Sequence, residues 1–196
     1  MSKVFAKALM ASEDVQSYVG TCKFYDGTSA AIGALANVDD GAFVSIDGLV
    51  LDGVYGAASY DYNVHAAYAP EAGHLTREDI CVVDIAGIDE WTKGNNTIKF
   101  GNKLVDLAVA AGGNVRFRRL MKGDMFWIGA GNFSATPTVG QYATVAATST
   151  LLTPNAAVTE NQFNVKICAS KALTVGQTVT STGANAYEQI YLVEVL

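Results

Sequence analysis

The side chains that could carry out chemistry are few in this 196-residue chain. Its two histidines, His65 and His74, do not have the short, fixed spacing typical of zinc ligands, and neither do Cys22, Cys81 and Cys168. No serine lies in a Gly-x-Ser-x-Gly elbow, and no loop carries the full glycine set of a dinucleotide-binding turn. We therefore predict no catalytic, cofactor-binding or metal site, and we do not expect an enzyme.

Acidic residues gather at turn-like positions. Asp39-Asp40 and the pair Asp47 and Asp52 could offer oxygen ligands to Ca²⁺. They lack the alternating oxygen donors and the closing glutamate of a calcium loop, so we interpret them as ordinary turn residues.

One basic cluster stands out in an acidic chain. Three of the four arginines, Arg116, Arg118 and Arg119, lie close together, and Lys122 follows them. Phe126 and Trp127 come next, and we expect both rings to be exposed. The cluster could bind carboxylates of a partner through paired arginine hydrogen bonds. It could equally be a solvated strand face with ion pairs inside the chain.

Composition limits the class of protein. There are 19 acidic and 13 basic residues, which gives a net charge of −6 and argues against nucleic acid as a partner. Half of the residues are hydrophobic and 16% are charged, which argues against disorder. We expect no export signal and no membrane span, because lysines and acids interrupt the first apolar stretch and no long apolar run follows. The three cysteines are then expected to be buried thiols of a protein made in a reducing cytoplasm.

The middle of the chain alternates between strand signals and turns. Residues 42–46 and 49–51 read as two strands joined by a turn at Asp47-Gly48. Residues 80–85 form a nearly continuous apolar run, which predicts a strand buried on both faces. Apolar residues at helical spacing predict one short helix near residues 103–111, ended by Gly112-Gly113.

Later segments continue the β pattern. Residues 115–120 and 125–128 are predicted to be strands around a turn, with Val115 and Phe117 on the face opposite to Arg116 and Arg118. The last third is poor in charge and rich in threonine, alanine and valine, which favour strands. All three prolines are expected in loops.

These signals predict a mainly β fold, a β-barrel or β-sandwich with one short helix near 103–111. We expect an N-terminal arm over residues 1–25 and a mainly β domain over 26–196. A division into two β units near residue 135 is the alternative.

The run from Leu104 to Phe126 resembles the head decoration proteins of tailed bacteriophages. In that family a short helix ends at Ala-Gly, and an arginine-containing strand leads into Lys-Gly-Asp and an aromatic residue. Four further segments resemble the family in the same order: 40–46, 64–70, 80–83 and 191–196. The similarity extends over residues 38–128, is loose over 136–190, and is absent from the first 35. The family's Tyr-Asp-Glu-Arg-like segment appears here only as Asp89-Glu90-Trp91, so no role is carried over to it.

The resemblance implies a virion structural protein that decorates and stabilises the outside of the capsid. Its implied partners are the major capsid protein, whose subunits it would bridge, and further copies of itself, often as trimers. The implied location is the capsid surface after synthesis in the host bacterial cytoplasm, with no nucleic acid or membrane as partner. Alternatives are a carbohydrate-binding or host-attachment module of the virion, or a tail structural protein. The predicted interface residues are Phe5, Arg116, Arg118, Arg119, Lys122, Phe126 and Trp127.

Overall fold

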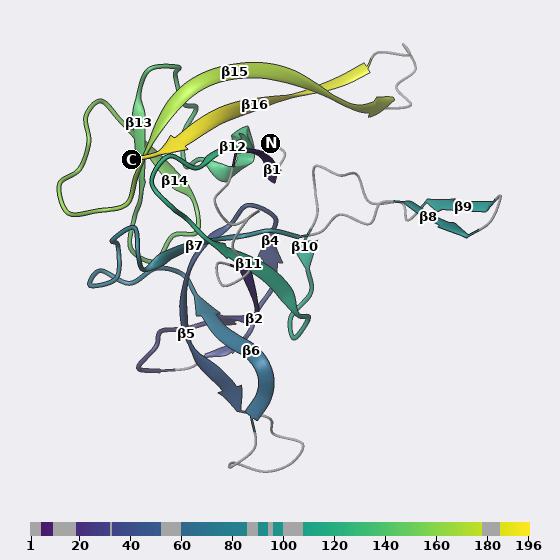
Figure 1. Ribbon diagram of the computed structural model, residues 1–196, viewed down its shortest axis with the longest axis vertical. Coiled ribbons are helices and arrows are strands. Elements are labelled where there is room, and N and C mark those ends of the chain that lie inside the picture. Colours follow the sequence, from purple (N-terminus) through teal and green to yellow (C-terminus); the bar gives the residue numbers. More distant parts are fainter. Residues whose placement is uncertain are drawn as a thin grey trace.

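The computed structural model describes residues 5–9, 19–31, 33–51, 60–85, 90–93, 96–99, 108–177 and 185–196 (Figure 1). These residues form strands and one short 3₁₀ helix, Ala130–Asn132. The mainly β prediction is therefore confirmed. The strands are β1 (Phe5–Leu9), β2 (Val19–Asp26), β3 (Ala34–Leu35), β4 (Val38–Asp39), β5 (Phe43–Leu51), β6 (Tyr60–Tyr68), β7 (Ile80–Val83), β8 (Glu90–Lys93), β9 (Asn96–Lys99), β10 (Ala108–Val109), β11 (Val115–Arg119), β12 (Met125–Gly129), β13 (Tyr142–Val145), β14 (Leu152–Asn155), β15 (Asn164–Gln177) and β16 (Asn185–Val195).

One sheet closes into a barrel in the lower part of Figure 1. Strands β11, β7, β5, β6 and β2 are hydrogen-bonded in that order, and β2 also pairs with β11. The closure leaves these five strands without a free edge, and β3 adds to the end of β2. Strands β2 and β6 run parallel, whereas the other neighbours in the barrel are antiparallel.

The ring of Phe117 packs among smaller side chains in the barrel interior. Phe117 of β11 packs with Cys22, Val44, Cys81 and Val83 in a buried cluster. Phe117 pairs in register with Gly20 of β2, where a Cβ atom would lie 2.5 Å from the ring. Gly20 therefore provides the space that the ring occupies.

The second sheet is antiparallel throughout and covers one side of the barrel, in the upper part of Figure 1. Its strand order is β1-β12-β16-β15-β13-β14. Phe43, Ile80 and Val82 of the barrel form one buried cluster with residues of this sheet such as Phe126 and Val193. Strand β7 and the start of β5, Phe43–Val44, are thus buried on both faces, because Val44, Cys81 and Val83 point into the barrel. The prediction for the apolar run at 80–85 is confirmed over Ile80–Val83, all of which are buried.

A tight turn carries the chain from the barrel to the second sheet. It joins β11 to β12 through Met121 to Asp124, with Gly123 at a φ of +89°. The buried carboxylate of Asp124 accepts a hydrogen bond from the Met121 N–H at 2.8 Å. The Lys122-Gly123-Asp124 motif is therefore a turn, and the predicted strands on each side of it are confirmed.

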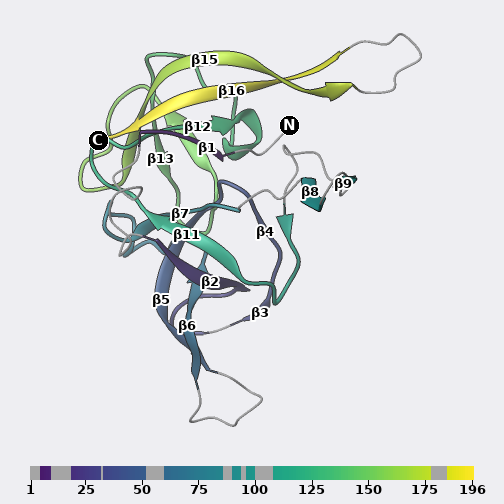
Figure 2. The same cartoon turned by 45° about the vertical axis from the view of Figure 1, so that its right-hand side comes forward.

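Strands β15 and β16 continue beyond the rest of the second sheet, as Figures 1 and 2 show. Strand β12 pairs with β16 from Ile190 onward, and β13 pairs with β15 only as far as Lys166. Beyond these points β15 and β16 pair only with each other among the described strands. We call residues 172–177 and 185–189 the ribbon.

The predicted helix near 103–111 is wrong in its described part. Ala108–Val109 form strand β10, which pairs with β4, and residues 103–107 lie outside the described residues. The Ala111 N–H donates to Asn37 Oδ1 at 2.9 Å, and Gly112 turns the chain at a φ of +84°. Long-range pairing with β4 outweighs the local helical spacing here.

Two turn predictions also differ from the structure. Strand β5 runs straight through Asp47-Gly48, and its register with β6 shifts between Ile46 and Leu49. The expected turn at Asp47-Gly48 is therefore an irregularity in the pairing of one continuous strand. Pro154 lies in strand β14, which ends the sheet, so its missing N–H costs no ladder hydrogen bond there.

The described parts of the predicted N-terminal arm are strands of the domain. Strand β1 pairs with β12 in the second sheet, and β2 closes the barrel with Cys22 buried inside it. In the part of the chain that the structure describes, no helix has the length and apolar character needed to cross a membrane.

Replacing Gly20 with alanine should destabilise the fold, because the added methyl group overlaps the Phe117 ring. We expect the free energy of unfolding to fall by about 2 kcal/mol, the cost typical of overpacking a core. Urea unfolding measures the change. Gly73→Ala is the control, since a Cβ there meets nothing within 4 Å. Equal stabilities of the two variants would contradict the packing described here.

Candidate functional site

The basic cluster is organised around one buried carboxylate, that of Asp84. Its Oδ2 atom pairs with Arg118 Nε and lies 2.9 Å from Arg116 Nη2. The side chains of Asp84 and Arg118 are 7% and 4% exposed, whereas that of Arg116 is 37% exposed. Arg118 is therefore an internal residue and cannot be a surface anchor. The alternative of ion pairs within the chain is correct for Arg116 and Arg118.

Arg116 keeps one buried nitrogen without a hydrogen bond. Its Nε atom has no partner among the described residues. The side chain lines a cavity of about 320 Å³ together with Ile85, Val109, Asn114 and Val115. Arg119 and Lys122 are exposed, so these two remain available to a partner.

Two of the predicted aromatic contacts belong to the core. Phe126 is fully buried, which corrects the expectation that it is exposed. Its alternation with Trp127 along β12 places it on the inner face of the second sheet. Phe5 packs against it with ring centroids 5.2 Å apart. Phe5 is thus part of strand β1 and the shared core, whereas Trp127 lies on the opposite face.

The outer face of the second sheet presents Trp127 beside a lysine. Trp127 pairs with Leu192, which in turn pairs with Ala169. Lys171 lies two residues further along β15, and its Nζ atom sits 4.1 Å from the centroid of a Trp127 ring. We call Trp127, Ala169, Lys171 and Leu192 the outer patch. The ammonium group over the indole ring forms a cation–π contact, and tryptophan is among the residues that contribute most to binding at interfaces.

The ribbon next to the outer patch has two open edges. No described strand pairs with β15 beyond Lys166 or with β16 before Ile190, except each other. Proteins usually protect such edges with prolines and several charges. The ribbon carries Glu188 as its single charge and has no proline. A two-stranded ribbon alone is marginally stable in water, so this element is suited to contact with another surface.

A second buried carboxylate, Asp40, connects the two sheets. Its Oδ2 accepts the Phe5 N–H of β1 at 3.0 Å, and its Oδ1 accepts the Ile85 N–H at 2.9 Å. The backbone carbonyl of Asp40 accepts Asn132 Nδ2 at 2.9 Å. Burial raises the pKa of Asp40 to about 7, and nearby Asp84 adds to this, although backbone hydrogen bonds act in the opposite direction.

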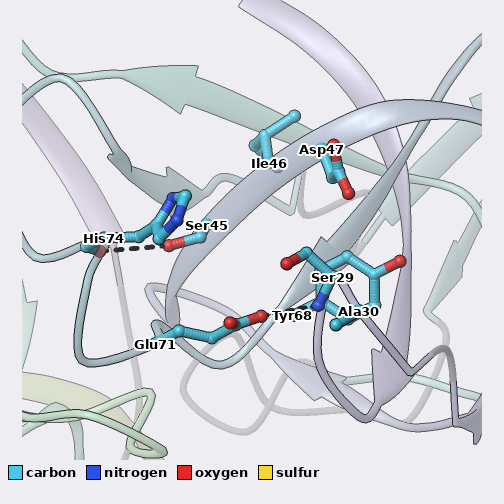
Figure 3. Close-up of a pocket in the computed structure, with 8 residues that line it drawn as sticks. All are labelled: Ser29, Ala30, Ser45, Ile46, Asp47, Tyr68, Glu71 and His74. Atoms are coloured by element: carbon cyan, nitrogen blue, oxygen red, sulfur yellow. Dashed lines mark hydrogen bonds between the residues drawn. The ribbon is translucent and has the colours of Figure 1, made fainter.

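A pocket of about 270 Å³ opens on the barrel, between strands β5 and β6 and two loops (Figure 3). It is lined by Ser29, Ala30, Ser45, Ile46, Asp47, Tyr68, Glu71 and His74. Glu71 Oε1 accepts the Ser29 N–H at 2.5 Å, which ties the two loops together at the rim. Ser45 Oγ donates to the His74 carbonyl at 3.5 Å, the dashed line at the left of Figure 3.

Three of the residues considered for redox or metal chemistry lie around the barrel interior: Cys22 pairs in register with His65, and Cys22 and Cys81 share one buried cluster. Cys22 and Cys81 are buried thiols, and burial raises the pKa of each to about 12, so neither forms a thiolate at neutral pH. Cys168 is only partly buried, unlike the prediction. His65 packs edge-on against Phe117, whereas His74 lies at the pocket. Within the described ranges, no three His, Cys, Asp or Glu side chains gather as a metal site would require.

Sequence reasoning missed the residues that organise these sites. Asp84 interrupts the apolar run Ile80–Ile85. A carboxylate inside a run that is expected to be buried needs a partner within the protein, and this signal could have predicted the ion pair. Asp40 was interpreted as an ordinary turn residue, because its hydrogen-bond partners, the N–H groups of Phe5 and Ile85, lie far from it in the sequence. Tyr68 gave no signal, since the pocket is formed by separate segments.

Comparisons with protein-family models, with curated proteins and with solved structures found no match. The function is therefore argued from the residues and from the geometry described above.

Replacing Arg118 with alanine should destabilise the protein, because Asp84 would lose its most buried partner. Removing one member of a buried ion pair typically costs about 3 kcal/mol or more. We expect a loss of this size in urea unfolding. Arg119→Ala removes an exposed arginine from the same strand and should change stability by less than about 0.5 kcal/mol. A similar effect of both variants would show that the Asp84 pair is not structural.

Asp40 should make stability depend on pH. Its pKa is higher in the folded state than in the unfolded chain, where it is near 3.8. The folded state then binds more protons, so this group's contribution is fully present below pH 3.8 and is lost as the pH rises through about 7. We expect the stability of Asp40→Asn relative to the native protein to increase between pH 5 and pH 7.5 by at least about 1 kcal/mol.

The comparison across pH isolates the titration, because the hydrogen bond that an asparagine would lose is lost at both pH values. Asp39→Asn, at the neighbouring position, is the control and should show a smaller change. A constant difference between Asp40→Asn and the native protein would mean that Asp40 stays ionised in the fold.

Proposed function

We propose that this chain is a structural protein of a tailed-phage virion that binds the outside of the capsid and bridges major capsid protein subunits. The observation that carries the proposal is the ribbon with its open edges, next to the outer patch. The resemblance of residues 104–126 to head decoration proteins supplies the viral context.

The ribbon supports an adhesive role on energetic grounds. Its backbone N–H and C=O groups can add to the edge of a sheet in another subunit, a common mode of protein recognition. Such pairing would also stabilise a two-stranded element that is weak by itself. Figures 1 and 2 show that β15 and β16 reach away from the body, so a partner can approach both edges.

The outer patch supplies a candidate anchor. Trp127 is partly buried and lies against Lys171, so its ring is held in place before any partner arrives. Tryptophan is among the residues that contribute most to binding, and an ordered ring loses little conformational entropy on contact. Arg119 and Lys122 remain candidate contacts with acidic groups of the shell.

The proposed mechanism is cohesion without bond chemistry. Each copy would contact neighbouring capsid subunits, and its binding free energy would add to the work needed to separate them. Binding of several copies, or of a homo-oligomer, would raise the effective affinity further. The proposed location is the capsid surface, reached after synthesis in the host bacterial cytoplasm.

The test is to image virions with and without this protein and to locate the density that is lost. We expect that density on the outside of the head, and we expect heads without the protein to release DNA at a lower temperature. Density in the tail, or identical release temperatures, would contradict the proposal.

The anchor is tested by adding purified protein back to stripped heads. Trp127→Ala should weaken binding by about tenfold or more, the loss typical of a central aromatic contact. Val158→Ala removes an apolar side chain that is 48% exposed, in a loop outside the ribbon and the outer patch, and should leave the affinity unchanged. Unfolding curves of both variants must match that of the native protein.

A further inference from the structure

The guanidinium group of Arg116 has more hydrogen-bond donors than the fold uses. Its Nη2 atom lies 2.9 Å from Asp84 Oδ2, and Arg118 Nε pairs with the same oxygen. The Nε atom of Arg116 is buried and has no hydrogen bond in the part of the chain that the structure describes. Buried N–H groups nearly always have a partner, because an unpaired one is costly. This N–H therefore points to an acceptor that the described residues do not supply.

Arg116 lines a cavity of about 320 Å³ where the chain turns from β10 into β11. Figures 1 and 2 both show β10 beside the start of β11. Three of the other described lining residues, Ile85, Val109 and Val115, are aliphatic and belong to the barrel cluster or pack against it. The Arg116 side chain is 37% exposed, so a molecule in the cavity can reach its guanidinium group.

A carboxylate on an apolar group matches these surroundings. Arg116 is the one charged side chain among the described lining residues, and guanidinium groups form strong, charge-assisted hydrogen bonds with carboxylate oxygens. Asn114 is exposed beside it and offers a side-chain amide as a second donor. The aliphatic lining suits an apolar stem better than a hydrated inorganic anion.

We propose that this cavity binds a carboxylate carried on a short aliphatic stem. Arg116 donates hydrogen bonds to the carboxylate, and Ile85, Val109 and Val115 pack against the stem. The volume of about 320 Å³ has room for both. The carboxylate comes either from an acidic side chain of a partner protein or from a free carboxylic acid. The inference does not depend on the structural role proposed above, since it is tested on the protein alone.

The test is an NMR titration at low salt that follows the Nε–H signal of Arg116 and the amide signals of Val109, Asn114 and Val115. The ligands are butyrate and Nα-acetyl-glutamate methylamide. Butyramide and butylammonium resemble butyrate in shape without its negative charge, and inorganic phosphate has negative charge without a stem. We expect the two carboxylates to bind with a Kd on the order of 1 mM and the three controls to cause no saturable shift.

The net charge of −6 makes this test selective, because an acidic protein repels anions in general. Tighter binding of the glutamate compound supports a side chain of a partner protein, and tighter binding of butyrate supports a free acid. Saturable binding of butyramide or butylammonium, phosphate binding as tight as that of butyrate, or an unchanged Arg116 Nε–H signal would each overturn the proposal.

A matched pair of variants tests the donor. Arg116→Lys keeps the positive charge but removes the Nε–H group, and it should weaken butyrate binding about tenfold. Arg119→Lys makes the same change at an exposed position of β11 that does not line the cavity, and it should leave the Kd unchanged. Equal losses in the two variants would show that the cavity is not the site.

A second pair leaves the contact between Arg116 and Asp84 intact. Asn114 is exposed, and Asn114→Asp should weaken butyrate binding about tenfold, because it places a like charge beside the ligand. Asn155→Asp adds the same charge in β14, outside the cavity, and should change the Kd by less than about twofold. An unchanged Kd in Asn114→Asp would overturn the proposal even if Arg116→Lys does not fold. Unfolding curves show which variants are folded.

Discussion

The architecture depends on two strands, β5 and β7, that are shared by both halves of the molecule. Phe43, Ile80 and Val82 pack against the second sheet, and the alternating residues Val44, Cys81 and Val83 fill the barrel. Each strand therefore contributes to two cores at once. A polar residue on either face would remain without water, so Phe43–Val44 and Ile80–Val83, the parts shared by both cores, have to be apolar. The barrel and the second sheet are stabilised together for this reason, and neither has a core that is independent of the other.

Two carboxylates flank these shared strands, and the fold satisfies them in different ways. Asp84 follows β7 and is paired with two arginines, which compensate its charge. Asp40 precedes β5 and receives backbone N–H groups from Phe5 and Ile85, with no cation among these partners. The first arrangement fixes β11 against β7, whereas the second fixes β1 against the barrel. Arg116 and Arg118, which suggested a binding surface, are thus paired with Asp84 inside the fold. The exposed surfaces that could bind a partner are the outer patch and the ribbon.

The sequence predicted the parts of the fold that local patterns determine. The β class, the strand at Ile80–Val83 and the strands on both sides of Lys122-Gly123-Asp124 follow from apolar alternation and turn chemistry. The errors lie where contacts between segments far apart in the sequence determine the local structure. Pairing with β4 makes a strand of Ala108–Val109, and β5 continues through Asp47-Gly48 with an irregularity in its pairing. The inner face of the second sheet buries Phe126. The pocket could not be predicted, because Tyr68 and its neighbours come from separate segments whose contact depends on barrel closure.

Barrel closure also has a consequence for the order in which the chain can fold during synthesis. Strand β2 is made early, but Cys22 pairs with Val115, and β1 pairs with β12. Strands β1 and β2 therefore lack these partners until β12 and β11 have been synthesised. Contacts so distant along the chain slow folding, because a long loop must close before they form. The apolar side chains of Phe43 and of Ile80–Val83 stay partly uncovered during that interval, and exposed apolar surface of this kind favours aggregation.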